Sequence, residues 1–181
     1  MDIIAHGLWA NAIYRGVTTG KNIKPSKTKI WTVIFFGLIP DLLSFGPIFF
    51  WSIYEFLFRG MEIPFRGMHS QVSIPNYIFG TYNYTHSFII FLAIFGIVWL
   101  IRKKPFWLMY GWGLHILIDI FSHAKEFFPT PFLFPISNFQ VSGWSWHNPV
   151  FMAINYSLLV SVYLGLYLWH KWKNKRIIQK S

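Results

Sequence analysis

The chain has 181 residues, of which 54% are apolar and only 12% are charged, and it contains no cysteine. This composition excludes an ordinary soluble domain, and the lack of cysteine excludes disulfides and thiolate metal sites. The net charge of +10 lies in short basic blocks between apolar runs, which argues against a nucleic-acid-binding face. The sequence therefore predicts one all-α, polytopic membrane domain over residues 1–181, with no nucleic-acid partner.

The first third of the chain contains three predicted helices. Residues 3–17 (IIAHGLWANAIYRGV) form a short helix, which lacks a basic n-region and a cleavage site and is expected to be retained. The apolar run 30–58 is longer than one span needs and contains Pro40 and the sequence SFGP. Because proline and glycine interrupt helices, we expect two helices, 30–43 and 48–58, and the second is placed at the membrane interface.

Three more helices are predicted in the remainder of the chain. They cover residues 88–101 with a backward extension over 84–87, residues 106–122, and residues 150–169. A spanning helix needs about 20 largely apolar residues, and several of these runs reach that length. The expected fold is a membrane helix bundle with four or five spanning helices and one additional interfacial helix.

The basic blocks predict how the bundle is oriented. Lysine and arginine are concentrated at 21–29, 102–104 and 171–180, and such blocks favour the cytoplasmic side. The connections 59–85 and 124–148 are then expected on the outer side, and the aromatic and proline residues of 124–148 suit the membrane interface.

The segment GWGLHILIDIFSH at 111–123 sets two histidines and an aspartate among large apolar residues. His115, Asp119 and His123 are spaced by four residues, so on an α-helix they lie along one stripe. Ionisable residues in membrane segments are costly and are usually paired or functional. A divalent ion would stabilise a carboxylate beside neutral imidazoles, so this stripe predicts a metal site.

Three further candidates are expected at the same side of the membrane. His6, Asp41 and His86 lie near the outer ends of their predicted helices, which brings the candidate ligands to six. His69 and His170 are interpreted as histidines that form ordinary hydrogen bonds or lie at the interface. The role of His147, in the sequence SGWSWHNP, is left open.

Several motifs resemble the bacterial integral-membrane proteins of the YdjM-like metal-dependent hydrolase family. They are MDIIAHGLW, FFGLIPDLLSFGP, THS at 85–87, GLHILIDIFSH and FFPTPFLFPISNFQV, and together they extend over nearly the whole chain. The order of histidine and aspartate in these motifs is also distantly similar to that of the secreted zinc-dependent phospholipases C. The resemblance implies a location in the bacterial cytoplasmic membrane.

The resemblance also implies a ligand set. Asp41, His86, His115 and Asp119 would hold one zinc ion, His6 with Asp119 would hold a second, and His123 would add to a further site. The chain lacks the additional His-x-x-x-Glu pair of the phospholipases, so one or two divalent ions are expected. Asp41 and Asp119 are the implied catalytic residues, with Asp41 as general base.

Three functions compete at this point. The first is hydrolysis of a phosphoester in a membrane lipid or lipid-linked substrate by metal-activated water. The second is a non-catalytic membrane scaffold in which a structural metal clamps the helices. The third, a metal carrier, would need polar residues that continue to the cytoplasmic side, and the lower helix halves offer few. The oligomeric state is left open.

Overall fold

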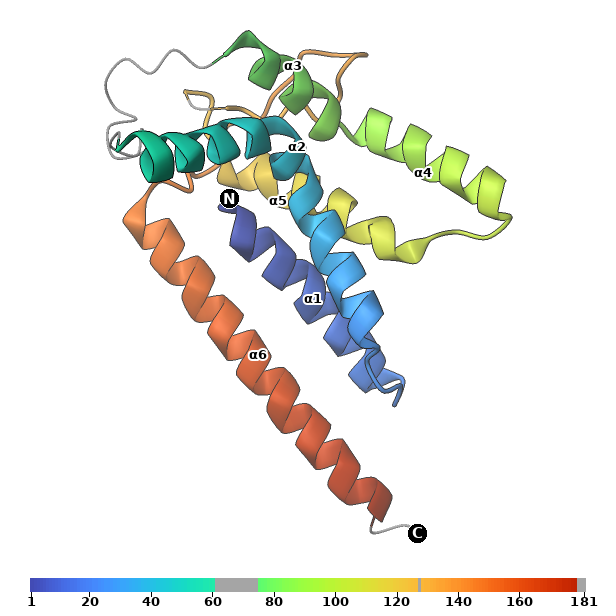
Figure 1. Ribbon diagram of the computed structural model, residues 1–181. Helices are drawn as coiled ribbons and strands as arrows, with labels where there is room; N and C mark the ends of the chain where they lie inside the picture. Colours follow the sequence, from blue (N-terminus) through green and yellow to red (C-terminus); the bar gives the residue numbers. More distant parts are fainter. Residues whose placement is uncertain (61–74, 127, 179–181) are drawn as a thin grey trace.

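The computed structural model describes residues 1–60, 75–126 and 128–178. Within these ranges all regular secondary structure is helical, which confirms the predicted all-α class. The elements are α1 (Ile3–Gly20), α2 (Lys27–Arg59), α3 (Asn76–Thr85), α4 (Phe88–Arg102), the short 3-10 helix η2 (Trp107–Met109), α5 (Tyr110–Ser122) and α6 (Pro149–Ile178) (Figure 1).

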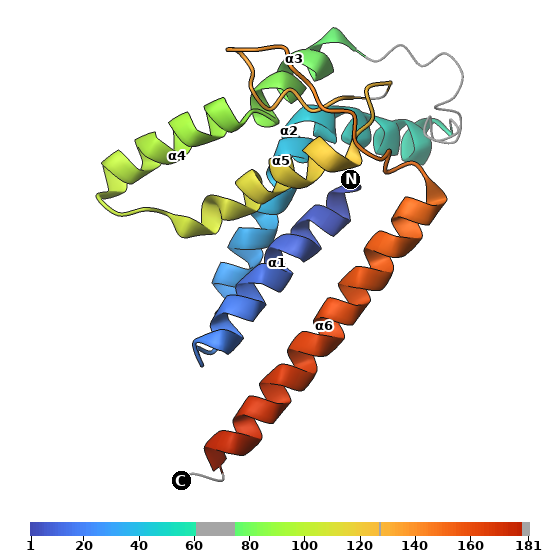
Figure 2. The same cartoon turned by 180° about the vertical axis from the view of Figure 1, so that it is seen from behind.

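Helices α1, α2 and α5 form the centre of the molecule, and α6 packs along α1. Both views show α4 and α6 projecting from this centre in different directions (Figures 1 and 2). The central helices approach closely at Gly37 and Gly111. A Cβ atom on Gly111 would lie 2.6 Å from the carbonyl oxygen of Val33, and one on Gly37 would lie 3.0 Å from that of His6. These glycines therefore allow the three backbones to meet.

Helix α2 corrects one prediction. The run 30–58 does not divide into two helices, because α2 continues through both Pro40 and Pro47. Figure 1 shows that α2 instead changes direction along its length. Proline removes one backbone donor and crowds the preceding turn, which bends a helix without ending it where neighbouring helices support both halves. Helix α2 has such support from α1, α3 and α5.

Helices α3 and α4 also differ from the prediction. The connection predicted over 59–85 contains α3, and the backward extension of 88–101 over 84–87 is wrong because the chain bends there. The two helix axes meet at 59°, with His86 and Ser87 at the break. The side chain of Ser87 accepts a hydrogen bond from the backbone N–H of Ile90 at 3.2 Å, which starts α4 anew.

The number of spans is smaller than predicted. Helices α2 and α6 are long and apolar enough to cross a membrane, and the bent pair α3–α4 would be a third if it counts as one span. The expected four or five spans are not supported, because α5 has only 13 residues and extends about 20 Å, short of a hydrocarbon core of about 30 Å. Helix α1 has 18 residues but includes buried Asn11, Thr18 and Thr19.

Two of the basic blocks lie at the same end of the molecule. The Lys173 ammonium near the end of α6 donates to the carbonyl oxygens of Thr19 at 3.0 Å and Gly20 at 2.7 Å, at the end of α1. His6, in the first turns of α1, is about 22 Å from Lys21 along the helix axis at 1.5 Å per residue. The third block, 102–104, lies in the connection between α4 and α5, away from that end (Figure 1), so the three blocks do not share one end as predicted.

Candidate metal centre

The six predicted ligands come from four helices or their ends, and all six are buried. His115 and Asp119 lie on α5 and His123 ends it, while His86 ends α3. His6 lies in the first turns of α1. Asp41 is in the middle of α2 rather than near the end of a helix, because α2 continues past the predicted break.

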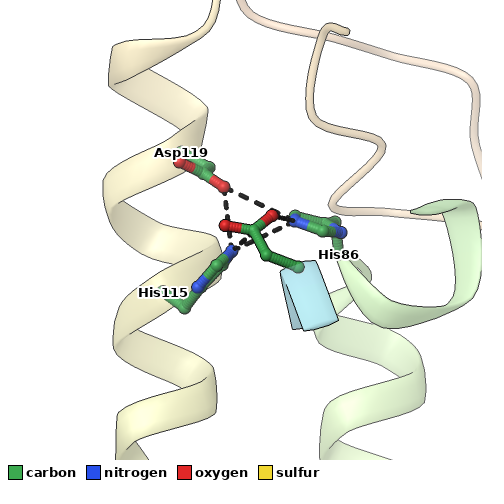
Figure 3. Close-up of side chains that lie close together, drawn as sticks. His86, His115 and Asp119 are labelled. Atoms are coloured by element: carbon green, nitrogen blue, oxygen red, sulfur yellow. Dashed lines mark hydrogen bonds and ion pairs between the residues drawn. The ribbon is translucent and has the colours of Figure 1, made fainter. Parts of the chain in front are cut away.

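Four of these residues form one group that can hold a metal ion. One ligand atom from each of Asp41, His86, His115 and Asp119 lies within 4.8 Å of the others. Figure 3 shows His115 and Asp119 projecting from one helix towards His86 on another segment. The structure therefore brings together residues from α2, α5 and the break between α3 and α4.

The imidazole Nε2 atoms and the carboxylates point at a common centre. Nε2 of His115 lies 3.1 Å from Nε2 of His86 and 3.1 Å from Oδ2 of Asp119. Nε2 of His86 lies 3.5 Å from the same Oδ2 and 3.4 Å from Oδ1 of Asp41. A fifth distance, from His115 Nε2 to Asp41 Oδ1, is 3.7 Å.

These separations match those of a tetrahedral ion. Zinc binds nitrogen and carboxylate oxygen at about 2.0–2.1 Å, so the ligand atoms at the corners of its tetrahedron are about 3.3–3.4 Å apart. The observed distances of 3.1 to 3.7 Å fall on both sides of that value. The four side chains thus have the spacing, as well as the donor types, of a small divalent-cation site.

The second ring nitrogen of His86, His115 and His123 is next to a backbone carbonyl group. Nδ1 of His115 lies 2.7 Å from the oxygen of Gly37, and Nδ1 of His86 lies 3.2 Å from that of Tyr82. Nδ1 of His123 lies 2.6 Å from the oxygen of Phe128. A carbonyl oxygen only accepts, so each Nδ1 carries the proton and the lone pair of a neutral ring is on Nε2, as in a metal ligand.

The other carboxylate oxygen of Asp119 faces a second set of nitrogen atoms. Oδ1 lies 3.0 Å from Nε2 of His6 and 3.4 Å from Nε2 of His123. The amino group of Met1 lies 2.5 Å from the same oxygen and 3.0 Å from His123 Nε2. His6 and His123 are therefore not part of the four-residue group, and Asp119 stands between the two sets.

Nδ1 of His6 is buried and has no hydrogen-bond partner within the described residues. Nε2 of His6 and Oδ2 of Asp119 are buried as well, and the atoms close to them are the ion-pair partners given above. Burial lowers the pKa of His6 to about 3, so its ring is neutral at neutral pH. A buried neutral imidazole beside a buried carboxylate is costly alone, and the pair fits a cation.

The other histidines lie away from this cluster. His147 is exposed, and its ring lies 4.0 Å from that of Trp146 between centroids. His170 is exposed on α6 and shares a hydrogen bond of 3.1 Å with Asn174. This agrees with the prediction that His170 forms an ordinary hydrogen bond. His69 lies outside the described residues.

The sequence reasoning missed residues that support the ligands. Thr85 lies with its hydroxyl 2.9 Å from His86 Nδ1, and that hydroxyl also lies 2.9 Å from Ser44 on α2. Tyr82 stacks on His86 with ring centroids 3.8 Å apart. Ser122 donates to Asp119 Oδ1 at 3.2 Å, and its spacing of three from Asp119 could have indicated this. Tyr82 and Thr85 gave no signal, because α3 was not predicted.

No family model matches this sequence, and no curated protein or solved structure matches it. The resemblance to the YdjM-like proteins and the phospholipases C therefore stays a prediction.

Proposed function

We propose that the chain is a membrane-embedded, metal-dependent hydrolase that cleaves a phosphoester of a lipid or lipid-linked substrate. The position of Asp119 is the observation that supports this most, because its two oxygens face two different sets of nitrogen atoms. Pairs of divalent ions about 3.5–4 Å apart are common in phosphatases and nucleases. The resemblance of its motifs to those of YdjM-like proteins supports the same reaction, and membership of that family is part of this proposal.

The ligand atoms on each side of Asp119 would hold one metal ion, and zinc suits both positions because it prefers nitrogen and carboxylate ligands. The first ion would be held by Asp41, His86, His115 and Asp119. The second would be held by Asp119, His6 and His123, and it would displace the Met1 ammonium group from Asp119 Oδ1. When bound, two divalent ions supply an activated water near neutral pH and stabilise the negative charge of a phosphoryl displacement.

Asp41 is the proposed general base. It is 6% exposed, whereas His86, His115 and Asp119 are each 1% exposed or less, so a water reaches the group most easily on the side of Asp41. Its Oδ1 atom is the one that faces His86 and His115. This leaves Oδ2 to accept the proton of the attacking water.

Metal content tests the ligand assignment. Protein purified in detergent should contain about one or two equivalents of zinc or a similar divalent ion per chain. His115→Ala should lose the ion of the first set, while His170→Ala, which removes an exposed histidine, should keep it. Full metal retention in His115→Ala would contradict the assignment.

Activity separates catalysis from a structural role. The reconstituted protein should release phosphate or a phosphorylated head group from a lipid-linked phosphoester, chelator should stop the reaction, and zinc should restore it. Asp41→Asn should lower the rate by about 100-fold or more in protein that remains folded and partly metallated. A broad lipid panel without any metal-dependent product would contradict the hydrolase.

The second candidate function is a structural metal clamp, and the burial of the cluster favours it. A structural zinc site is four-coordinate and closed, and the four residues of the first set are almost fully enclosed. In that case Asp41→Asn would lower thermal stability in proportion to the metal it loses, and no substrate would be turned over.

The site is proposed to lie at the outer face of the membrane. Basic residues favour the cytoplasmic side, and the end of α1 that contacts Lys173 is opposite to the end that carries His6. Because the chain lacks cysteine, Ser142→Cys should react with an impermeant thiol reagent in intact cells and Lys24→Cys should not. The reverse pattern would place the site in the cytoplasm.

A further inference from the structure

A groove of about 380 Å³ lies between α1, α5 and α6. Its walls are almost entirely apolar, and the side chains that form them are Trp9, Ile13, Leu114, Ile118, Phe121 and Phe151. Ile13 and Phe121 are 42% and 63% exposed, so the groove is open to the surroundings of the helices. Helix α6, which forms one wall, is one of the two helices that are long and apolar enough to cross a membrane.

The groove is adjacent to the metal centre because both use α5. Leu114 and Ile118 each precede a ligand, His115 and Asp119, by one residue, so the two stripes are about 100° apart around the helix. Ser122 belongs to both places, since it lines the groove and donates to Asp119 Oδ1 at 3.2 Å. A molecule in the groove would therefore end close to that carboxylate.

One buried polar group in the groove lacks a partner. Asn155 on α6 is 7% exposed, and its Oδ1 accepts a hydrogen bond of 2.9 Å from the indole N–H of Trp9. Its Nδ2 atom, within the described part of the chain, has no hydrogen-bond partner. An unpaired buried amide donor costs free energy, which a ligand oxygen in the groove would recover.

We propose that this groove binds one acyl chain of the substrate lipid and that Asn155 donates a hydrogen bond to the ester oxygen of that chain. This assignment rests on the proposed function and specifies how its substrate is held. The size of the groove favours a single chain over a helix of another protein, because one helical turn with its side chains occupies roughly 400–600 Å³. The ester would then lie between the groove and Asp119, with the phosphoester directed to the metal ligands.

Photo-crosslinking tests the groove without relying on catalysis. The probe is a phosphatidylethanolamine with a diazirine on one acyl chain, in vesicles with the full chain. Crosslinks should form on the α5 segment 110–122, and Ile118→Trp, which fills the groove, should reduce them by about 10-fold. The matched control Leu158→Trp adds the same ring at a 52% exposed position of α6 that does not line the groove, and it should leave these crosslinks unchanged.

Asn155→Asp tests the polar contact separately. It keeps Oδ1 as the acceptor for Trp9 and removes the unpaired donor. Crosslinking of the ester-linked probe should fall several-fold relative to an ether-linked probe of the same chain length. Equal loss for both probes would overturn the role assigned to Asn155, since only the ester has the carbonyl oxygen that accepts this hydrogen bond.

The outcomes separate the groove from the hydrolase. Crosslinks on α5 that Ile118→Trp removes, without hydrolysis of any phosphoester, would support the groove and overturn the proposed function. Metal-dependent hydrolysis whose rate in Ile118→Trp is unchanged for long-chain and short-chain lipids alike would overturn the groove. Crosslinks between α5 and a second copy of the chain would overturn it as well, because the occupant would then be protein. If Ile118→Trp does not fold, Leu114→Phe provides the same comparison with a smaller increase in volume.

Discussion

Helices α5 and α6 are both rich in apolar residues, yet they are built for different surroundings. Helix α5 has 13 residues and buries His115 and Asp119 among Trp112, Ile116 and Ile120. Helix α6 is more than twice as long, and only 11% of its most apolar window is buried by the rest of the chain. The difference indicates that α5 is stabilised by contacts inside the protein, whereas α6 has the length and surface of a helix surrounded by lipid.

Asp119→Asn would have the largest effect on the α5 side of this comparison. The substitution removes the charge that pairs with the Met1 amino group at 2.5 Å and faces the imidazoles on both sides. Leaving a buried charge without its partner costs about 3–5 kcal/mol, so we expect a strong loss of thermal stability together with the bound metal.

The matched control is Asp2→Asn. Asp2 begins α1 by accepting the backbone N–H of Ala5 at 3.1 Å, and asparagine caps helices equally well. Metal analysis and thermal unfolding in detergent compare the two. Similar metal contents in both variants would mean that Asp119 is not a ligand.

Leu164→Lys tests the surroundings of α6. Leu164 lies near the middle of α6 and is 56% exposed. A lysine at the centre of a spanning helix costs about 2.5–3.5 kcal/mol of insertion free energy, so less protein should remain in membranes after alkaline extraction. Leu164→Met keeps the apolar character and should behave like the unaltered chain. Equal retention of the lysine variant would indicate that α6 does not lie in lipid.

Gly111→Ala tests the packing that places His115. The added Cβ would lie 2.6 Å from the backbone oxygen of Val33. Because this oxygen belongs to the backbone, the overlap is relieved only if α5 moves away from α2. We expect a loss of about 1–3 kcal/mol in unfolding free energy, which thermal unfolding in detergent would detect. Gly96→Ala, on α4, meets open space and should be neutral or slightly stabilising.

Thr85→Val should give the smallest effect, because Thr85 supports a ligand without being one. Its hydroxyl lies 2.9 Å from Nδ1 of His86 and links that ring to Ser44. Loss of such a supporting contact lowers metal affinity by about 10-fold. A competitive chelator titration measures it. Thr81 is on the same helix, and its hydroxyl donates to the carbonyl oxygens of Tyr77 and Ile78 in the preceding turn. Thr81→Val should therefore not change the metal affinity.

Much of the candidate site could be predicted from the sequence. The spacing of His115, Asp119 and His123 placed three polar side chains on one stripe. Ionisable residues within apolar runs are costly unless they are paired, which indicated these side chains as metal ligands. The resemblance supplied the four-residue set that the structure then brought together, with His6 and His123 on the other side of Asp119. The stripe on α5 was predictable because residue type and helical period are local properties.

The number of spans, the bend of α2 and the break before α4 were decided by the tertiary structure. Apolar composition alone does not distinguish a helix buried by protein, such as α5, from one surrounded by lipid, such as α6, because both remove the same side chains from water. Pro40 marked a weak point of α2, but the helices packed on both sides determined that α2 continues through it and bends along its length. The backbone carbonyl groups of Gly37, Tyr82 and Phe128 lie beside the imidazoles. Every residue has such a carbonyl group, so the sequence does not single these three out and only the folded chain does.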